Sequence, residues 1–302
     1  MASSIVVAGL ATLAALAQPP AAPPPPADEP DSTAMALTVV DNRMTVAVTI
    51  DGAGPFRFLV DSGATRTVIS DRVAAMLRLK GDAPVILHSV GGEGVVQTVR
   101  IAALGVGALR ARPIVAPVLA EADIGAAGIV GLDALARGRM VLDIARNRMT
   151  IERAETRPAP LEASEIVVTA RRRYGQLVLA DADAAGQRIW AVVDTGSMAT
   201  IGNGVLRDRL TARRRAEARA VTITDVTGRS IAAAYAPLAD VRLSAWHLKN
   251  VVVAFCDAHA FDRFGLSEKP SMLLGMDVMR AFSRVSIDFR DRTVRLLKRD
   301  EA

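Results

Sequence analysis

The sequence predicts an all-β protein made of two similar lobes with one short helix each, and three observations lead to this prediction. Apolar and polar side chains alternate with a period of two in stretches such as residues 45–50, which is typical of a half-buried strand. The chain also repeats itself, because residues 44–64 align with residues 175–197 and residues 128–152 align with residues 272–296. Finally, 51% of the 302 residues are hydrophobic but only 4% are aromatic, so each lobe needs an aliphatic core.

The two repeats predict the same order of elements in each lobe. The first repeat reads as a strand, a turn with Gly, a second strand and a turn of the form acid-x-Gly. The second repeat reads as an apolar pair, a Gly, a short helix and a hairpin with a polar turn. Asp133 and Asp277 lie where the short helices begin, and helix capping is favoured over catalysis for both.

The start of each lobe is predicted from a third similarity. The segment EIVVTARRRY, residues 165–174, corresponds to residues 36–44, which predicts that a strand opens each lobe. The same segment resembles the TonB box near the start of outer-membrane receptors, which is the weaker alternative.

The N-terminal residues predict a leader that is removed on export. An apolar run over residues 5–17 ends in Ala-Leu-Ala, a small-x-small cleavage signal, and is too short for a comfortable membrane span. A periplasmic or secreted protein is therefore expected, with an uncleaved anchor as the alternative. The expected segments are a signal peptide (1–17), a proline-rich linker (18–30), lobe one (31–155), a linker (156–164) and lobe two (165–299).

Charge does not favour a nucleic-acid-binding protein. The net charge is +5, and two arginine clusters, residues 171–173 and 213–215, lack the interleaved aromatic residues of a nucleic-acid surface. We therefore expect solvated arginine faces and no nucleic-acid partner.

Cysteine and histidine give no sign of a disulfide, a metal or a cofactor. Cys256 is the one cysteine, and its apolar neighbours predict a buried, unreactive thiol. The three histidines, His88, His247 and His259, have no metal-ligand spacing, so packing or surface roles are expected for them.

Two acid turns are the strongest functional signal. Asp61 lies in FLVDSGATRTVIS and Asp194 in WAVVDTGSMATIGN, each between apolar stretches. Burying a carboxylate is costly, so two in matching surroundings suggest a shared purpose. Two carboxyls about 3 Å apart share one proton, so that one member can activate a water molecule while the other donates a proton. This pair could hydrolyse an amide without a cofactor, and neither acid is assigned a fixed role.

The segments VDSGATRTVI and VDTGSMATI resemble the D-[ST]-G-[AS] active-site turns of the aspartic proteases. The apolar-apolar-Gly elements of that family resemble residues 129–131 and 273–275, and the short helices that follow are most similar to those of the bacterial retropepsin-like proteases. This resemblance implies two pepsin- or retropepsin-like β-barrel lobes in one chain, with an active-site cleft between them.

The resemblance also implies a function. It predicts an aspartic endopeptidase that uses Asp61 and Asp194 to cleave extended polypeptide and needs no cofactor. Two alternatives remain: a non-catalytic peptide-binding module, and a homodimer in place of a monomer that pairs its own two lobes.

The residues beside the acids are expected to shape the turns. Gly63 and Gly196 would take φ values closed to other residues and bring N–H groups toward the carboxylates. The resemblance implies that Ser62 and Thr195 donate hydroxyl hydrogen bonds across the lobe interface.

Positions farther along each turn also match the family. Ala64 and Ser197 stand where retropepsins and pepsins, respectively, carry these residues. Thr67 and Thr200 follow their acids at equal spacing and are expected to fix the far side of each turn, or to be ordinary strand residues.

Two hairpins are the candidates for lids over the cleft. Residues 87–97 carry Gly91 and Gly92 at their tip, and residues 222–231 carry Thr227 and Gly228. Their positions, between the acid turn and the apolar-apolar-Gly element, match the flaps of the family. Neither hairpin has the flap Tyr of pepsins, which is a departure from that pattern.

Overall fold

The computed structural model describes residues 4–6, 34–36, 38–40, 43–107, 109–111, 113–135, 138–153, 160–162, 165–173, 176–179, 182–184, 186–210 and 218–299. Nearly all of the expected signal peptide and all of the proline-rich linker lie outside these residues, as do Arg213–215 and much of the linker between the lobes. Within the described part of the chain, the helices are all too short or too polar to cross a membrane.

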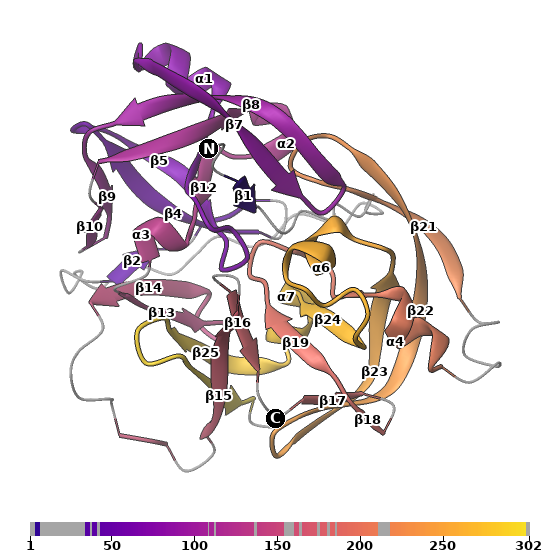
Figure 1. Cartoon of the computed structure of the whole chain (residues 1–302). Coiled ribbons are helices and arrows are strands. Elements are labelled where there is room, and N and C mark those ends of the chain that lie inside the picture. Colours follow the sequence, from indigo (N-terminus) through magenta and orange to yellow (C-terminus); the bar gives the residue numbers. More distant parts are fainter. Residues whose placement is uncertain are drawn as a thin grey trace, which may run out of the picture.

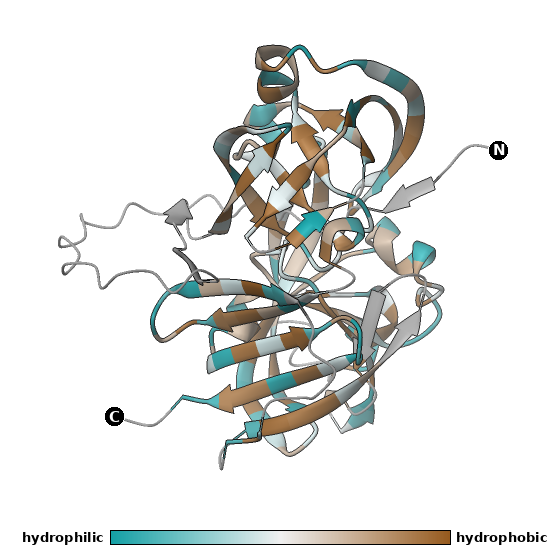
Figure 2. Cartoon of the chain, turned by 90° about the vertical axis from the view of Figure 1, so that its left-hand side faces the viewer, coloured by the Kyte–Doolittle hydropathy of each residue, from teal (hydrophilic) through white to brown (hydrophobic). Residues whose placement is uncertain are grey.

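The fold is all-β and consists of two lobes with barrel-like sheets, as the sequence predicts (Figure 1). In the first lobe, β4 (Arg43–Ile50) follows the predicted alternation from residue 46, because Val46, Val48 and Ile50 are buried whereas Ala47 and Thr49 are exposed; Thr45 departs from it and is buried. Apolar residues recur along the strands of both lobes (Figure 2) and form the core.

Lobe one contains an 11-stranded sheet in the described residues. Its strands are β1 (Ser4–Val6), β3 (Thr38–Val40), β4 (Arg43–Ile50), β5 (Ala53–Val60), β6 (Val68–Ser70), β7 (Gly81–Ser89), β8 (Gly92–Ile101), β9 (Leu104–Val106), β10 (Leu109–Ala111), β11 (Ile114–Leu119) and β12 (Gly128–Val130). Its helices are α1 (Asp71–Met76), α2 (Glu121–Ile124) and α3 (Leu132–Leu135).

Lobe two is built on the second sheet, which has 15 described strands. They are β2 (Ala34–Ala36), β13 (Gly138–Asp143), β14 (Arg148–Arg153), β15 (Glu165–Arg173), β16 (Gln176–Leu179), β17 (Ala182–Ala184), β18 (Gln187–Arg188), β19 (Trp190–Val193), β20 (Ile201–Gly202), β21 (Arg219–Thr224), β22 (Ser230–Leu243), β23 (Trp246–Phe255), β24 (Ser271–Leu274), β25 (Phe282–Asp288) and β26 (Thr293–Lys298). The helices are α4 (Gly204–Asp208), α6 (His259–Arg263) and α7 (Met276–Met279).

Each lobe therefore has three described short helices, not the single one that the repeat predicts. The predicted helices are α3 and α7. Two of the additional ones, α1 and α4, begin at side-chain caps, because Ser70 and Asn203 accept the N–H groups of Val73 and Leu206. Such caps satisfy N–H groups that a short helix would otherwise leave unpaired.

The hairpin β13–β14 lies in the first half of the chain but pairs with β25 of the second half. The order β2-β14-β13-β25-β26-β15 therefore forms a sheet that joins the two halves of the chain. Arg139 on β13 and Asp288 on β25 are register partners and form an ion pair of 2.9 Å, with both side chains largely buried. This shared sheet fixes one lobe against the other.

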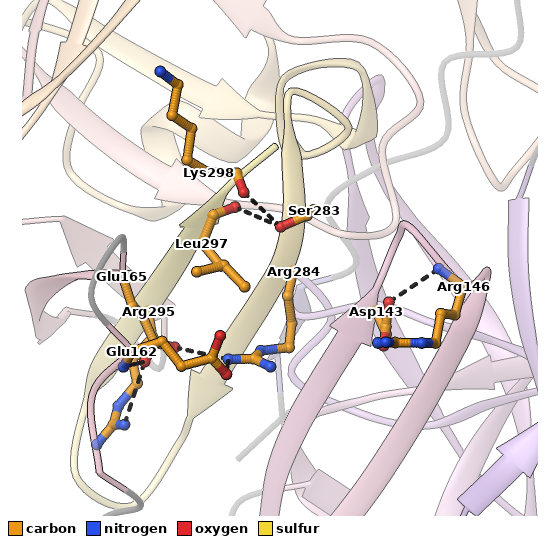
Figure 3. A network of polar contacts seen from close by, with 9 residues as sticks. All are labelled: Asp143, Arg146, Glu162, Glu165, Ser283, Arg284, Arg295, Leu297 and Lys298. Carbon is orange, nitrogen blue, oxygen red and sulfur yellow. Dashed lines mark hydrogen bonds and ion pairs between the residues drawn. The ribbon is translucent and has the colours of Figure 1, made fainter. Parts of the chain in front are cut away.

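Polar contacts extend this connection to the linker (Figure 3). The guanidinium of Arg284 on β25 donates to the carboxylate of Glu162, which precedes β15. The same guanidinium lies 3.6 Å from a carboxylate oxygen of Glu165, the first residue of β15. Ser283 donates to the carbonyl of Lys298 at 2.7 Å. The segment 165–173 is thus a sheet strand, as predicted, and its first residue is held by arginine.

Candidate active site

The backbone places the two acids at equivalent points of the two lobes. Strand β12 runs parallel to β5, and the N–H of Asp61, which follows β5, donates to the carbonyl of Val130 at 3.1 Å. In lobe two, β24 runs parallel to β19, and the N–H of Asp194 donates to Leu274 at 3.0 Å. The apolar-apolar-Gly elements therefore anchor the start of each acid turn.

Reciprocal hydrogen bonds hold the two acid turns against each other. The N–H of Ser62 donates to Oγ1 of Thr195 at 3.0 Å, and the N–H of Thr195 donates to Oγ of Ser62 at 3.1 Å. The Ser62 hydroxyl donates to the carbonyl of Val193 at 2.9 Å, and the Thr195 hydroxyl donates to Val60 at 2.9 Å. All four bonds are buried, so the separation of the turns is strongly fixed.

Each carboxyl has one oxygen bound to its own turn and one oxygen free of such bonds. Oδ1 of Asp61 accepts the N–H groups of Gly63 (2.6 Å) and Ala64 (3.0 Å). Oδ1 of Asp194 accepts those of Gly196 (3.0 Å) and Ser197 (3.2 Å).

Both Oδ2 atoms are buried and receive no hydrogen bond from an N–H or O–H group. The charge of one carboxyl acts on the other, so ionisation of one opposes ionisation of its neighbour. Asp61 and Asp194 therefore form a coupled pair.

The surroundings favour a proton on this pair. Burial raises the pKa of Asp61 well above its usual range, and the charge of Asp194 raises it further. Burial also raises the pKa of Asp194, although the neighbouring Asp61 carboxyl and the N–H groups of its own turn oppose that rise. Because the groups titrate together, the shared proton belongs to the pair.

The reason for glycine in the turns differs from the prediction. Neither Gly63 nor Gly196 has a φ in the left-handed region, so the expectation of special φ values was wrong. At Gly196 the reason is close approach: a Cβ would lie 2.3 Å from Cγ of Asp61. The absence of a side chain there makes room for the carboxyl of the other lobe.

Behind each turn lies a threonine–aspartate pair. The Thr67 hydroxyl donates to Asp133 at 2.7 Å and accepts the N–H of Gly131 at 3.2 Å. In lobe two, the Thr200 hydroxyl likewise donates to Asp277 at 2.7 Å and accepts the N–H of Gly275 at 3.1 Å. These threonines connect the turn to the helix that follows the apolar-apolar-Gly element.

The expected capping by the two aspartates is only partly correct. Each carboxylate accepts the N–H of the next residue, Ala134 or Val278, but the cap position of α7 is Gly275. The aspartates are the second residues of α3 and α7, within the first turn, and they also accept the hydroxyl groups of Thr67 and Thr200.

The two candidate lids meet tip to tip. We call β7–β8 with its turn the first hairpin, and β21–β22 with residues 225–229 the second hairpin. The N–H of Gly91 donates to Oδ2 of Asp225 at 2.9 Å. A Cβ at Gly91 would lie 2.6 Å from that oxygen, and one at Gly92 would lie 2.7 Å from a guanidinium nitrogen of Arg229. Glycines thus allow the second hairpin to pack on the first.

The tip of the second hairpin is built around the same aspartate. Oδ1 of Asp225 accepts the N–H and hydroxyl of Thr227 and the N–H of Arg229. Gly228 has φ of +78°, and its Cα faces Asp123 of lobe one. Thr227 and Gly228 therefore shape a turn that contacts the opposite lobe.

Apolar residues at the tips are exchanged between the lobes. Val90 of the first hairpin is buried in a cluster with lobe-two residues such as Phe261. Val226 of the second hairpin is buried in a cluster with lobe-one residues such as Ala64 and Ile129. Both hairpins are therefore closed against the opposite lobe.

Sequence reasoning missed the contacts between the lobes. It gave no role to Asp225, which is 1% exposed, and it treated the histidines as scattered, although His88 and His259 are in contact. Cys256 behaves as expected, since burial raises the pKa of its thiol to about 12.

Comparison with protein families agrees with this geometry. Residues 46–137 match the family described as gag-polyprotein putative aspartyl protease, and residues 180–278 match the family described as aspartyl protease. No curated protein matches the chain. Each matched segment contains one acid turn, one hairpin tip and one apolar-apolar-Gly element.

Proposed function

Because the chain belongs to the retropepsin-like aspartic proteases, with two lobes in one chain, we propose that it is an aspartic endopeptidase that uses Asp61 and Asp194. The observation that carries the proposal is the pair of buried Oδ2 atoms, one from each lobe, that no N–H or O–H group satisfies. Buried polar atoms are normally hydrogen-bonded, so an unsatisfied pair in a rigid frame suits a water molecule or a substrate.

The chemistry follows from the shared proton. The ionised carboxyl takes a proton from a water molecule as the water attacks the peptide carbonyl. The protonated carboxyl hydrogen-bonds to the carbonyl oxygen, on which negative charge develops, and a proton then passes to the departing nitrogen. The hydrogen bonds between Ser62 and Thr195 keep both carboxyls in place during these steps.

Substrate access requires the hairpins to move. Asp61 is 1% exposed and Asp194 is fully buried, and the closed hairpins join the lobes at their tips. Opening would break the contact between Gly91 and Asp225 and withdraw Val90 and Val226 from the opposite lobes. Closure over a bound peptide would then exclude water from the reaction.

A cavity of about 220 Å³ lies between the first hairpin, the second hairpin and α2. Its lining is mixed, with apolar side chains such as Leu87 and Leu119 and charged ones such as Glu93 and Arg229. We propose that a substrate side chain binds there, with its apolar part against the leucines and any polar group toward the charged residues.

The remaining parts of the proposal concern the setting of the enzyme. Both acids belong to one chain, which supports a monomer over a homodimer. The apolar run at residues 5–17 supports export to the periplasm or beyond. A non-catalytic peptide-binding module remains the second candidate function, because a closed cleft also suits binding without cleavage.

Peptide-library cleavage over a range of pH tests the proposal. The wild type is compared with Asp61→Asn and Asp194→Asn, and each substitution should lower kcat by about 10³-fold or more. Asp183→Asn, on β17 and away from the turns, is the matched control and should retain activity. Turnover that persists in both dyad variants would exclude the proposed mechanism, whereas peptide binding without turnover in the wild type would favour the binding module.

The pH profile is a second test. One proton on the pair is needed, so activity should fall at low pH when both acids are protonated and at high pH when neither is. Because the pKa values of both acids are raised, the loss of activity at high pH should occur well above pH 4, the usual pKa of a carboxyl group being about 4. A rate that rises steadily above neutral pH would contradict this mechanism.

A further inference from the structure

Three side chains with metal-binding atoms meet where the first hairpin contacts lobe two. His88 lies at the end of β7, Glu93 at the start of β8, and His259 at the start of α6. Nδ1 of His88 is 2.9 Å from Nε2 of His259 and 3.2 Å from Oε2 of Glu93. One ligand atom from each residue lies within 4.8 Å of the others.

The fold holds these residues together independently of their side chains. His88 and Glu93 are register partners across the first hairpin. The N–H of His259 donates to the carbonyl of Val90 at 2.9 Å, which fixes α6 to the hairpin tip. The three ligand atoms are thus positioned by backbone contacts, as a preorganised site requires.

The spacing fits a four-coordinate metal ion. Zinc binds imidazole nitrogen at about 2.0–2.1 Å, which separates neighbouring ligands of a tetrahedral site by about 3.3 Å. Two of the three separations, 2.9 and 3.2 Å, lie close to that value, and the third, between Glu93 and His259, is no longer than 4.8 Å, so a small side-chain rotation would complete the set. Two imidazoles and one carboxylate are also a ligand set that zinc uses, with the fourth position open to water.

The surroundings provide both burial and access. The side chain of His88 is 4% exposed, whereas those of His259 and Glu93 are 26% and 59% exposed, so an ion can arrive from solvent. Oδ2 of Asp262 lies 3.9 Å from Nδ1 of His259, the ring nitrogen that faces away from the cluster. At 3.9 Å this contact is longer than a hydrogen bond, so Asp262 adds negative charge near the cluster without fixing the ring.

Charge near the cluster is mixed. Glu93 and Asp262 provide two carboxylates, while the guanidinium of Arg263 lies near enough to act on His88.

We propose that His88, Glu93 and His259 form a zinc site that bridges the first hairpin and lobe two. The ion would bind Nδ1 of His88, Nε2 of His259 and a carboxylate oxygen of Glu93. Because two ligands come from the hairpin and one from α6, bound zinc would hold the hairpin closed. If the chain is the protease proposed above, zinc would therefore slow substrate access reversibly.

Isothermal titration of the untagged chain with Zn²⁺ tests the site. His88→Ala and His259→Ala should each weaken binding by about 100-fold or more. His247→Ala is the matched control, since His247 is the one remaining histidine and lies exposed beside Asp240. The double variant Asp61→Asn/Asp194→Asn should bind zinc like the wild type, which separates this site from the acid pair.

Hydrogen exchange tests the bridge. Zinc should slow exchange of the Gly91 and His259 amides by about 10-fold in the wild type and leave His88→Ala unchanged. Absence of zinc binding, equal binding by His88→Ala, or binding that leaves those amides unprotected would each overturn the proposal. These measurements use no peptide cleavage, so their outcome is independent of whether the chain is a protease.

Discussion

The acid turns of the two lobes make nearly the same contacts, whereas the two hairpins that join the lobes do not. Each turn has a carboxyl bound by two N–H groups, a hydroxyl that reaches the other lobe and a threonine–aspartate pair behind it. The first hairpin instead carries glycines and a histidine, and the second carries a buried aspartate and an arginine.

This difference shows which parts must be symmetric. Two carboxyls that share a proton need equivalent surroundings, because a strong bias toward one would fix the proton there. The hairpins have only to fit each other, so an acceptor on one can match an N–H on the other. Symmetry is thus retained at the acids and replaced by complementarity at the tips.

After the loss of an acid itself, the largest expected effect comes from breaking the symmetry at a turn. In Gly196→Ala the new methyl group would overlap the carboxyl of Asp61, whose Cγ lies 2.3 Å from the Cβ position. Displacing a catalytic group by about 1 Å costs about 100-fold, so kcat/KM should fall by that factor or more. Gly81→Ala is the control, because the nearest atom there is 4.0 Å away, and it should leave the rate unchanged. Equal rates for both variants would show that Asp61 does not depend on that space.

The repeats and the two acid turns made most of this site predictable. Matching motifs placed Asp61 with Asp194 and the threonines behind them, because local strand and turn signals recur in both halves. Contacts between the hairpins could not be predicted, since they join residues such as Gly91 and Asp225 that have no common motif. The histidine cluster was missed for the same reason: His88 and His259 are 171 positions apart, which no ligand spacing describes.

The threonine–aspartate pairs test whether the symmetry extends to stability. Thr67→Val and Thr200→Val each remove a buried hydroxyl that donates to a partly exposed carboxylate, and should lower the free energy of unfolding by about 1–2 kcal/mol. Denaturant unfolding measures both, and Thr67→Ser and Thr200→Ser, which keep the hydroxyl, should lose much less. A large loss in only one lobe would show that the lobes use these pairs differently.

The shared proton predicts a pH-dependent stability. Burial raises both carboxyl pKa values, so their contribution to stability is fully present below the unfolded value of about 4 and is lost as pH rises through the folded values. In Asp194→Asn the side chain at this position does not ionise, so its part of the loss of stability at high pH is absent. The variant should therefore be about 2 kcal/mol more stable than the wild type at pH 7.5 and nearly equal at pH 4. Thermal unfolding at both pH values measures this, and a variant less stable than the wild type at pH 7.5 would contradict the raised pKa values.

The smallest effect is expected at the hairpin tips, where Asp225→Asn would place an amide N–H₂ group against the N–H of Gly91. Oδ1 can keep its three donors from the second hairpin, so the turn itself should survive while the bond between the lobes is lost. One such bond is worth about 1.4 kcal/mol, so exchange of the Gly91 amide should quicken by about 10-fold with little change in global stability.

Thr227→Val separates the two roles of Asp225. It removes a donor to Oδ1 within the second hairpin but leaves the bond from Oδ2 to Gly91. Exchange at Gly91 should therefore stay close to that of the wild type. If both variants quicken it equally, the first hairpin is held by the shape of the second hairpin's turn, and complementarity at the tips does not depend on the single bond between Gly91 and Asp225.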